Sequence, residues 1–322
     1  MRDDVVETMR EYTEKTRIPL DRLLKHARLR RSKYYEWKRR YGLENRHNGN
    51  VPKANWLFEH EKEAIIDYAK NNPEEGYRRL AYRMIDDDVV YATPSSVYRV
   101  LRAAGMLRKY SVAKNKSKGI GYSQPDGPHK EWHIDISYVN ILGTFLFLVA
   151  IIDGYSRYVV HHELRAAMEE KDVQLVVQRA LERFPGHKLR IISDRGSQFI
   201  AKDFKEFIRY AGVSHTFTSV GYPQSNGKIE RFFRTAKTSC IRRQSFLSVH
   251  DARAQLDEFV RYYNHTRLHS AIRYVTPFDR LVGKDTEIIK TRGHKLLEAH
   301  RVRVEYHLTS TLDPDVVLSD SR

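Results

Sequence analysis

The stretch WHIDISYVNILGTFLFLVAIIDGYSRYVVHHEL, residues 132–164, decides the fold. Its first part alternates between apolar and polar side chains, which predicts a strand over 132–139 whose polar face carries Asp135. Residues 144–152 are almost continuously apolar, as in a strand that is covered on both faces. An Asp-Gly turn and a further strand over 157–164 then complete a three-stranded meander.

Beyond this meander, the pattern changes to helices that alternate with strands. Amphipathic helices are expected over 173–184 and 204–211, and short apolar strands over 189–193 and 214–217. A meander followed by such alternation indicates one mixed five-stranded sheet with helices on its faces. The expected fold class is therefore α/β.

A small basic helical unit is expected at the N-terminus, over 1–50, which holds 14 Lys and Arg against 8 Asp and Glu. Helices are predicted over 5–15, 20–26 and 32–40, the last capped by Ser32. Two short helices, a turn and a third basic helix are typical of a helix-turn-helix. A solvated basic bundle without a binding role is the alternative.

A second helix-turn-helix is expected over 56–108. Helices are predicted over 59–71 and 78–85, and a third begins after Thr93, the cap before a proline, and ends at Gly105. The acidic run between the second and third of these helices, Asp86 to Asp88, is interpreted as a solvated loop and not as a metal site.

The remaining boundaries follow from composition. Residues 101–130 carry seven Lys and Arg against one acid, which indicates a basic linker that could follow phosphates. The expected organisation is a linker over 109–127, a catalytic core over 128–247, a helical extension over 248–285 and a tail over 286–322. A strand-like run at 301–308 in this tail has no role that the sequence assigns.

Composition excludes several classes of protein. The formal net charge of +16 favours a polyanionic partner, most often nucleic acid. The single cysteine, Cys240, excludes an internal disulfide framework and a zinc finger with two or more Cys ligands. The longest apolar run, 145–152, is too short to cross a membrane, and neither a secretory signal nor a phosphate-binding loop is recognisable. A soluble intracellular protein that handles nucleic acid is expected.

Three acids stand out as candidate catalytic residues. Asp135 lies on the polar face of the first strand, Asp194 follows the fourth strand, and Glu230 begins a helix on which it shares a face with Arg234 and Lys237. Carboxylates suit two Mg²⁺ or Mn²⁺ ions, which activate a hydroxyl and stabilise charge in phosphoryl transfer on nucleic acid. Since triples of acids are common, the residues alone make this role plausible without deciding it.

Several motifs together carry a resemblance. WHIDISYV, SDRGSQF and GYPQSNGKIERFFRTAK resemble the integrase core that retroviral integrases share with insertion-sequence transposases. Asp194 and Glu230 are separated by 35 residues, the spacing of that family. EEGYRRL, KYYEW and the segment YNHTRLHSAIRYVTPFDR are similar to flanking segments of insertion-sequence transposases.

The resemblance implies an RNase H-like fold and a DNA transposase or integrase. It implies strand cleavage that exposes a 3′-hydroxyl and transfer of that hydroxyl into target DNA, without ATP, a nucleotide cofactor or a covalent protein–DNA intermediate. Asp135 would bridge two Mg²⁺ or Mn²⁺ ions, with Asp194 on one ion and Glu230 on the other. The expected partners are double-stranded DNA at terminal inverted repeats and at the target, and further copies of the chain. No membrane is expected, and the expected location is the bacterial cytoplasm, associated with the nucleoid.

Basic and polar side chains are expected to contact the DNA. They are Arg31, Lys33, Lys38 and Arg39 in the first unit, Arg99 and Arg102 in the second, Lys114, Lys116 and Lys118 in the linker, and Gln224, Lys228, Arg231, Arg234 and Lys237 around the helix that carries Glu230. His133 and Asp153 could approach the metals, although structural roles are favoured for both. Two other functions stay open: a metal-dependent nuclease of the same fold, and a domesticated DNA-binding regulator without catalysis.

Overall fold

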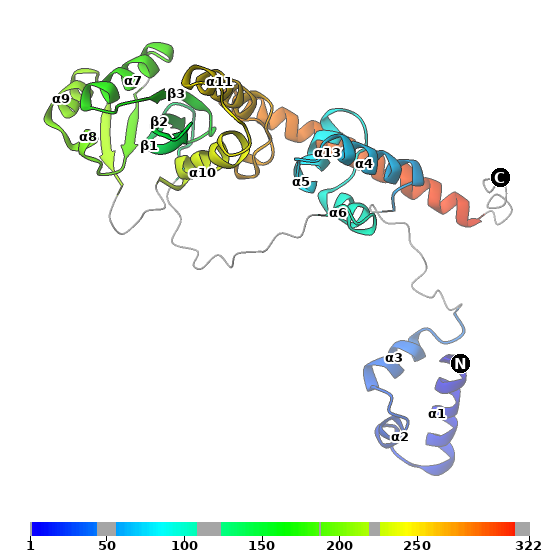
Figure 1. Ribbon diagram of the computed structural model, residues 1–322. Coiled ribbons are helices and arrows are strands. Elements are labelled where there is room, and N and C mark those ends of the chain that lie inside the picture. Colours follow the sequence, from blue (N-terminus) through cyan, green and yellow to red (C-terminus); the bar gives the residue numbers. More distant parts are fainter. Residues whose placement is uncertain (1, 44–55, 108–123, 187, 219–225, 313–322) are drawn as a thin grey trace. The chain divides into compact units, whose positions relative to one another are not determined.

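The chain forms two compact units, Met1–Pro52 and Lys53–Arg322 (Figure 1). The computed structural model describes residues 2–43, 56–107, 124–186, 188–218 and 226–312. The predicted side chains Lys114, Lys116, Lys118 and Gln224 lie outside these ranges.

The first unit is a bundle of three helices. They are α1 (Arg2–Thr16), α2 (Leu20–His26) and α3 (Arg31–Arg39). Its small core is made by Val6, Leu24 and Tyr34. The three predicted helices are confirmed, but the predicted cap is wrong, because α3 begins one residue before Ser32 and its N-cap residue makes no side-chain hydrogen bond.

The second unit begins with another helical group. It contains α4 (Glu59–Asn71), α5 (Tyr77–Asp86) and α6 (Pro94–Ala103). Thr93 caps α6 as predicted, since its hydroxyl accepts the N–H of Ser96 at 3.3 Å. Gly105 follows α6 with a φ of +68°, the left-handed conformation that glycine adopts after a helix. The core of this group is separate from the core of the sheet.

A mixed five-stranded sheet forms the centre of the second unit. Its strands are β1 (Glu131–Ile141), β2 (Thr144–Asp153), β3 (Val159–Arg165), β4 (Arg190–Ser193) and β5 (Ser214–Phe217). They lie in the order β3-β2-β1-β4-β5. The first three strands are antiparallel, whereas β4 pairs parallel to β1 and β5 parallel to β4. The sheet predicted from the meander and the alternation is confirmed.

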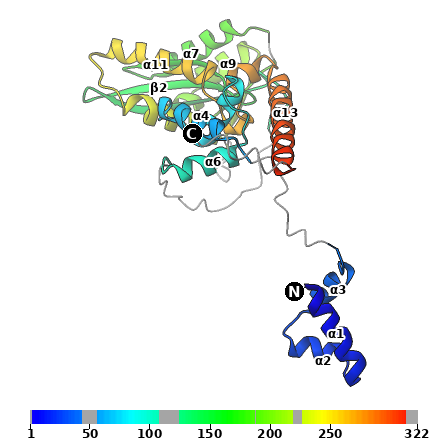
Figure 2. The ribbon, with the colours of Figure 1, turned by 90° about the vertical axis from the view of Figure 1, so that its right-hand side faces the viewer.

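Helices cover both faces of this sheet (Figures 1 and 2). One face packs against α7 (Glu170–Arg183), α8 (Ser197–Ile200) and α9 (Lys202–Tyr210). The other face packs against α10 (Gly227–Ala236), a π-helical turn (Lys237–Ile241) and α11 (Val249–His265). Strand β2 contributes alternate side chains to both cores, as its continuous apolar run requires. The predicted RNase H-like α/β class is confirmed.

The last helix of the described residues, α13 (Asp285–Leu312), is also the longest of them and follows a short α12 (Pro277–Leu281). The strand-like run at 301–308 therefore lies in a helix and forms no β element. Its alternating apolar residues resemble a strand, but Arg303 lies within α13 and donates hydrogen bonds to the Glu61 carboxylate of α4 and to the carbonyl of Tyr91. Contacts with the α4–α6 group hold this segment in a helix. Neither α13 nor any other helix in the described ranges combines the length and apolarity that a membrane span requires.

The acidic run at 86–88 is exposed, as its interpretation as a solvated loop predicts, but Asp86 lies at the end of α5 and two of the three acids pair with α13. The Asp86 carboxylate accepts two hydrogen bonds from Arg292 of α13, at 2.7 and 2.6 Å, and Asp88 pairs with Lys295. Arg292 is 4% exposed and also donates to the carbonyl of Tyr274. These acids join α13 to the α4–α6 group.

We expect Arg292→Met to lower the free energy of unfolding by about 1–2 kcal/mol, because it leaves the Asp86 carboxylate without its bidentate partner. The value is reduced from that of a fully buried pair, since the Asp86 side chain is 34% exposed. Urea unfolding of the full chain measures it. As a matched control, Arg301→Met breaks an exposed pair with Glu298 on the same helix and should change stability by less than about 0.5 kcal/mol. Equal effects of the two variants would contradict the assigned contact.

Candidate active site

A pocket of about 320 Å³ lies between β1 and α10. Asp135 and Glu230 both line it, together with three basic side chains on α10 and the turn that follows it. The lining residues are Asp135, Ile136, Ser137, Glu230, Phe233, Arg234, Lys237, Thr238 and Arg242. The structure thus brings together two predicted acids, almost a hundred residues apart in the chain, and the cations predicted to share the face of Glu230.

Regular structure positions each of the three acids. Asp135 lies in the middle of β1, opposite Ala150 of β2, and its Oδ1 accepts the N–H of Ile136 at 2.8 Å. Asp194 directly follows β4, and its Oδ1 accepts the N–H of Gly196 at 2.9 Å. Because β4 runs parallel to β1 as its neighbour, its carboxyl end lies near Asp135.

Glu230 owes its position to the packing of α10. The helix buries Ile229, Phe232, Phe233 and Ala236 against the sheet, which leaves Glu230 exposed beside the pocket. The π-helical turn after α10 continues the same surface, so that Lys237 still faces the pocket.

The electrostatics of Asp135 reflect its neighbours. Burial raises the pKa of its carboxyl group, and the negative charges of Asp194 and Glu230 raise it further, to about 7. The hydrogen bond from Ile136 and the ammonium of Lys237 act in the opposite direction and only partly offset this. Asp135 is therefore close enough to Asp194 and Glu230 for their charges to act on it.

The three carboxylates are the type of ligand that binds a divalent cation. Carboxylate oxygens are the ligands that Mg²⁺ and Mn²⁺ prefer, and a cation would relieve the repulsion that raises the pKa of Asp135. As they stand, no three His, Cys, Asp or Glu residues in the described ranges lie together closely enough to hold a metal ion. Asp194 and Glu230 are both exposed, and forming a metal site would require their side chains to move toward Asp135.

The predicted DNA-contacting residues differ in exposure. Exposed side chains in the described ranges are Arg31, Lys33, Lys38, Arg39, Arg99, Arg102, Arg231 and Arg234. Lys237 is half-buried in the pocket. Lys228 does not fit the prediction: its side chain is 8% exposed and its Nζ lies 3.4 Å from Oε1 of Glu131.

Sequence reasoning missed Glu131 and Arg242. Glu131 is 1% exposed and lies on the same face of β1 as His133 and Asp135, a placement that the two-residue period of the strand could have revealed. Arg242 lines the pocket and belongs to the basic run after Glu230. The continuation of this basic run beyond Lys237 could have identified Arg242 from the sequence.

The surroundings of Asp153 and His133 agree with the structural roles favoured for them, and Cys240 is buried as well. Asp153 accepts hydrogen bonds from the N–H of His129 and from the N–H and hydroxyl of Ser156, so it caps the turn after β2 as favoured. His133 is fully buried, and burial lowers its pKa, which keeps the imidazole neutral. Cys240 lies in the core under α11, and burial raises the pKa of its thiol to about 11.

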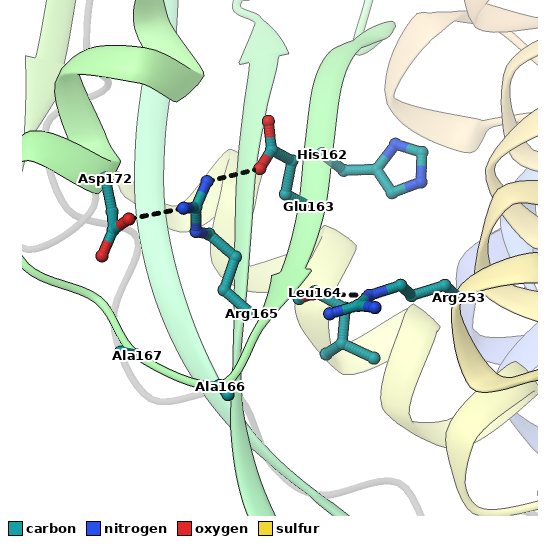
Figure 3. A pocket seen from close by; sticks show the side chains of 8 residues that line it. All are labelled: His162, Glu163, Leu164, Arg165, Ala166, Ala167, Asp172 and Arg253. Atoms are coloured by element: carbon teal, nitrogen blue, oxygen red, sulfur yellow. Dashed lines mark hydrogen bonds and ion pairs between the residues drawn. The ribbon is translucent and has the colours of Figure 1, made fainter. Parts of the chain in front are cut away.

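A second pocket, of about 410 Å³, lies at the end of β3 beside α7 and α11, and none of the three acids lines it (Figure 3). Arg165 donates to the carboxylates of Glu163 and Asp172, and Arg253 donates to the carbonyl of Leu164. Burial alone would raise the pKa of Glu163, but hydrogen bonds from His161, Arg179 and Arg165 outweigh it and lower the pKa to about 2. The charged side chains that line this pocket are paired with one another, and we therefore assign the pocket a structural role.

Comparisons with known proteins point to the same part of the chain. Residues 125–223 and 211–277 each match a family model described as an integrase core domain, and the two ranges include all three acids. The transposase for insertion sequence element IS904 of Lactococcus lactis is 25% identical over 211 residues, which cover 61% of this chain and 83% of the relative. The putative transposase InsK for IS150 of Escherichia coli is 22% identical over 277 residues, which cover 81% of this chain and 93% of the relative. A structure of the HTLV-2 integrase catalytic core domain in complex with magnesium has 16% identity and a TM-score of 0.37, and the match covers 48% of this chain and 97% of that chain.

Proposed function

Because this chain belongs to the integrase superfamily that includes insertion-sequence transposases, we propose that it binds the ends of a DNA element and joins them to target DNA. The chemical class is polynucleotidyl transfer. The observation that carries the proposal is the pocket between β1 and α10, which Asp135 and Glu230 line together with three basic side chains, and where the charges of Asp194 and Glu230 act on Asp135.

In this proposal, Asp135, Asp194 and Glu230 hold two Mg²⁺ or Mn²⁺ ions. When bound, the metals supply an activated water or 3′-hydroxyl and stabilise negative charge on the phosphoryl group. Asp135, whose carboxyl group is affected by the charges of both other acids, would contact both ions. Its pKa of about 7 means that the carboxyl group alone is only about half ionised at neutral pH, so binding a cation and losing a proton are coupled.

The basic side chains of the pocket would hold the DNA strand over the acids. Arg234, Lys237 and Arg242 come from α10 and the segment after it and line the same wall as Glu230. Contacts to phosphates of this kind position a strand without reading its sequence. The exposed arginines of α6 and the basic face of α3 are proposed to read the element ends.

We expect Lys237→Met to weaken binding of duplex DNA roughly fivefold and to reduce the slope of log K against log salt by about 0.9, the value of one phosphate contact. Fluorescence anisotropy across a series of salt concentrations measures both. Lys202→Met, which removes an 86% exposed lysine on α9, is the matched control and should leave the slope unchanged. An unchanged slope for Lys237→Met would show that Lys237 does not contact a DNA phosphate.

Two further inferences follow from the proposed reaction. Two element ends must be processed together, so we propose that copies of the chain assemble on DNA. Since chromosomal DNA is the substrate, we also propose that the protein acts in the bacterial cytoplasm at the nucleoid.

The proposal is tested by incubating the full chain with duplex DNA from the flanks of its own gene and a target plasmid, with Mg²⁺ or Mn²⁺. Joined products that require the metal would support a transposase. Nicks without joining would favour a metal-dependent nuclease, whereas tight binding without either product would favour a regulator that has lost catalysis.

A further inference from the structure

A cluster of buried charged and polar side chains lies on the same face of β1 as Asp135. Glu131 is 1% exposed and His133 is fully buried, and Nε2 of His133 lies 3.0 Å from Oε1 of Glu131. The same Oε1 is 3.4 Å from Nζ of Lys228, in the first turn of α10. A buried carboxylate is stable only when it is paired, so these contacts are required by the position of Glu131.

Glu131 contacts each of the elements that carry the three acids. It lies on β1, four residues before Asp135, and it pairs across the sheet with Arg190 at the start of β4, the strand that ends at Asp194. Through Lys228 it also reaches α10, two residues before Glu230. One carboxylate therefore joins β1, β4 and α10.

The turn after β2 packs closely against the side chains of Glu131 and His133. A Cβ atom on Gly154 would lie 3.1 Å from Oε1 of Glu131 and 3.1 Å from Nε2 of His133, closer than side chains normally approach. The N–H of Gly154 donates to the carbonyl of Glu131 at 2.8 Å. A larger residue at this position would force the neighbouring atoms of Glu131 and His133 to shift by a few tenths of an ångström.

The start of α10 depends on contacts of this kind. Its N-cap residue, Asn226, makes no capping hydrogen bond with its side chain. The Lys228 contact falls in the turn that carries Glu230, so it restrains that turn against β1.

We propose that Glu131 and Lys228 are positioning residues, which hold the turn carrying Glu230 in place relative to Asp135. The inference rests on the proposed function, in which Glu230 binds metal. Lys228 then acts through Glu131 and not through DNA, in contrast to the role that the sequence suggests. Its burial supports this assignment, because a lysine that binds phosphate keeps its ammonium accessible to solvent.

The test compares Lys228→Met, Glu131→Gln and the double variant in the full chain. We expect each single variant to bind Mn²⁺ about tenfold more weakly in calorimetry, the usual effect of removing a group that orients a metal ligand. The double variant should be no weaker than the weaker single variant, because both changes break one contact. Affinity for duplex DNA without metal should stay within twofold of wild type, and Lys228→Arg should retain most of the metal affinity.

Other outcomes separate the alternatives. Weaker DNA binding by Lys228→Met with unchanged Mn²⁺ affinity would overturn the proposal and make Lys228 a DNA contact. Fully additive losses in the double variant would also overturn it, because the two residues would then act independently. Lys202→Met serves as the neutral control. A wild-type chain that neither binds Mn²⁺ nor joins DNA would instead refute the proposed function itself.

Discussion

Glu230→Gln should reduce metal-dependent joining of DNA ends by at least roughly a thousandfold, because the loss of one metal ligand removes several kcal/mol of transition-state stabilisation. The amide keeps the size of the side chain but not its charge. Since Glu230 is exposed and lies outside the buried stripe of α10, the fold should be unaffected. Single-turnover joining with saturating DNA measures the rate of the chemical step.

A matched control separates this effect from a general loss of negative charge. Glu206→Gln changes an exposed glutamate on α9, on the opposite face of the sheet, and should keep the wild-type rate. DNA affinity of Glu230→Gln should not fall, because the variant adds no repulsion to the pocket. A Glu230→Gln chain that joins DNA at more than about a tenth of the wild-type rate would exclude Glu230 as a metal ligand.

Asp135→Asn should have two opposite effects: loss of joining and a more stable metal-free fold. The pKa of Asp135 is raised to about 7 in the folded chain, so between pH 4 and pH 7 the folded state retains a proton that the unfolded state has released. Stability therefore falls as the pH rises through this window. Asparagine does not titrate and can still accept the hydrogen bond from Ile136, so the variant should gain roughly 2–3 kcal/mol at pH 8.

Urea unfolding in EDTA at pH 5 and pH 8 measures this gain. The difference between variant and wild type should increase with pH, and Mg²⁺ should reduce it, because the cation stabilises only the wild-type carboxylate. Asp251→Asn provides the contrast. Hydrogen bonds from Gln255 and from the N–H of Leu247 lower the pKa of Asp251, so its replacement should not stabilise the chain. A gain for Asp135→Asn that does not depend on pH would contradict the electrostatic explanation.

The sequence predicted the sheet and the polar face of β1 because strands repeat every two residues. That period placed Asp135 on the face of β1 opposite the alternating apolar side chains. In the structure Asp135 lines the pocket between β1 and α10. The stripe of α10 was equally visible, because helices bury residues three and four apart. Local periodicity was enough to predict those elements in which a single apolar face packs against a single core.

The contacts of α13 could not be predicted in this way. The residues that dock it are charged, such as Arg292 and Arg303, and their partners lie more than 200 positions away in α4 and α5. Its apolar residues do not form one stripe, and Leu297 and Tyr306 remain exposed. The pairing of Glu131 with Lys228, 97 positions apart, was hidden for the same reason.

The segment that resembles the flank of insertion-sequence transposases gains a structural explanation. Asn264 accepts the N–H of Val159 and donates to its carbonyl, so it satisfies the backbone of β3 at the start of that strand. Tyr263 packs its ring against Phe232 of α10, with centroids 5.1 Å apart. This segment therefore supports α10 from behind, and the family motif contributes to the site without lining its pocket.

The most direct test of the account is to locate the metal. Crystals of the full chain with a DNA end, grown in Mn²⁺, should show anomalous peaks between Asp135, Asp194 and Glu230, with Asp135 in contact with both ions. Because no three His, Cys, Asp or Glu side chains in the described ranges lie closely enough together to hold a metal ion, the account also predicts that Asp194 and Glu230 move toward Asp135. Mn²⁺ bound elsewhere, or bound without Glu230, would contradict the account.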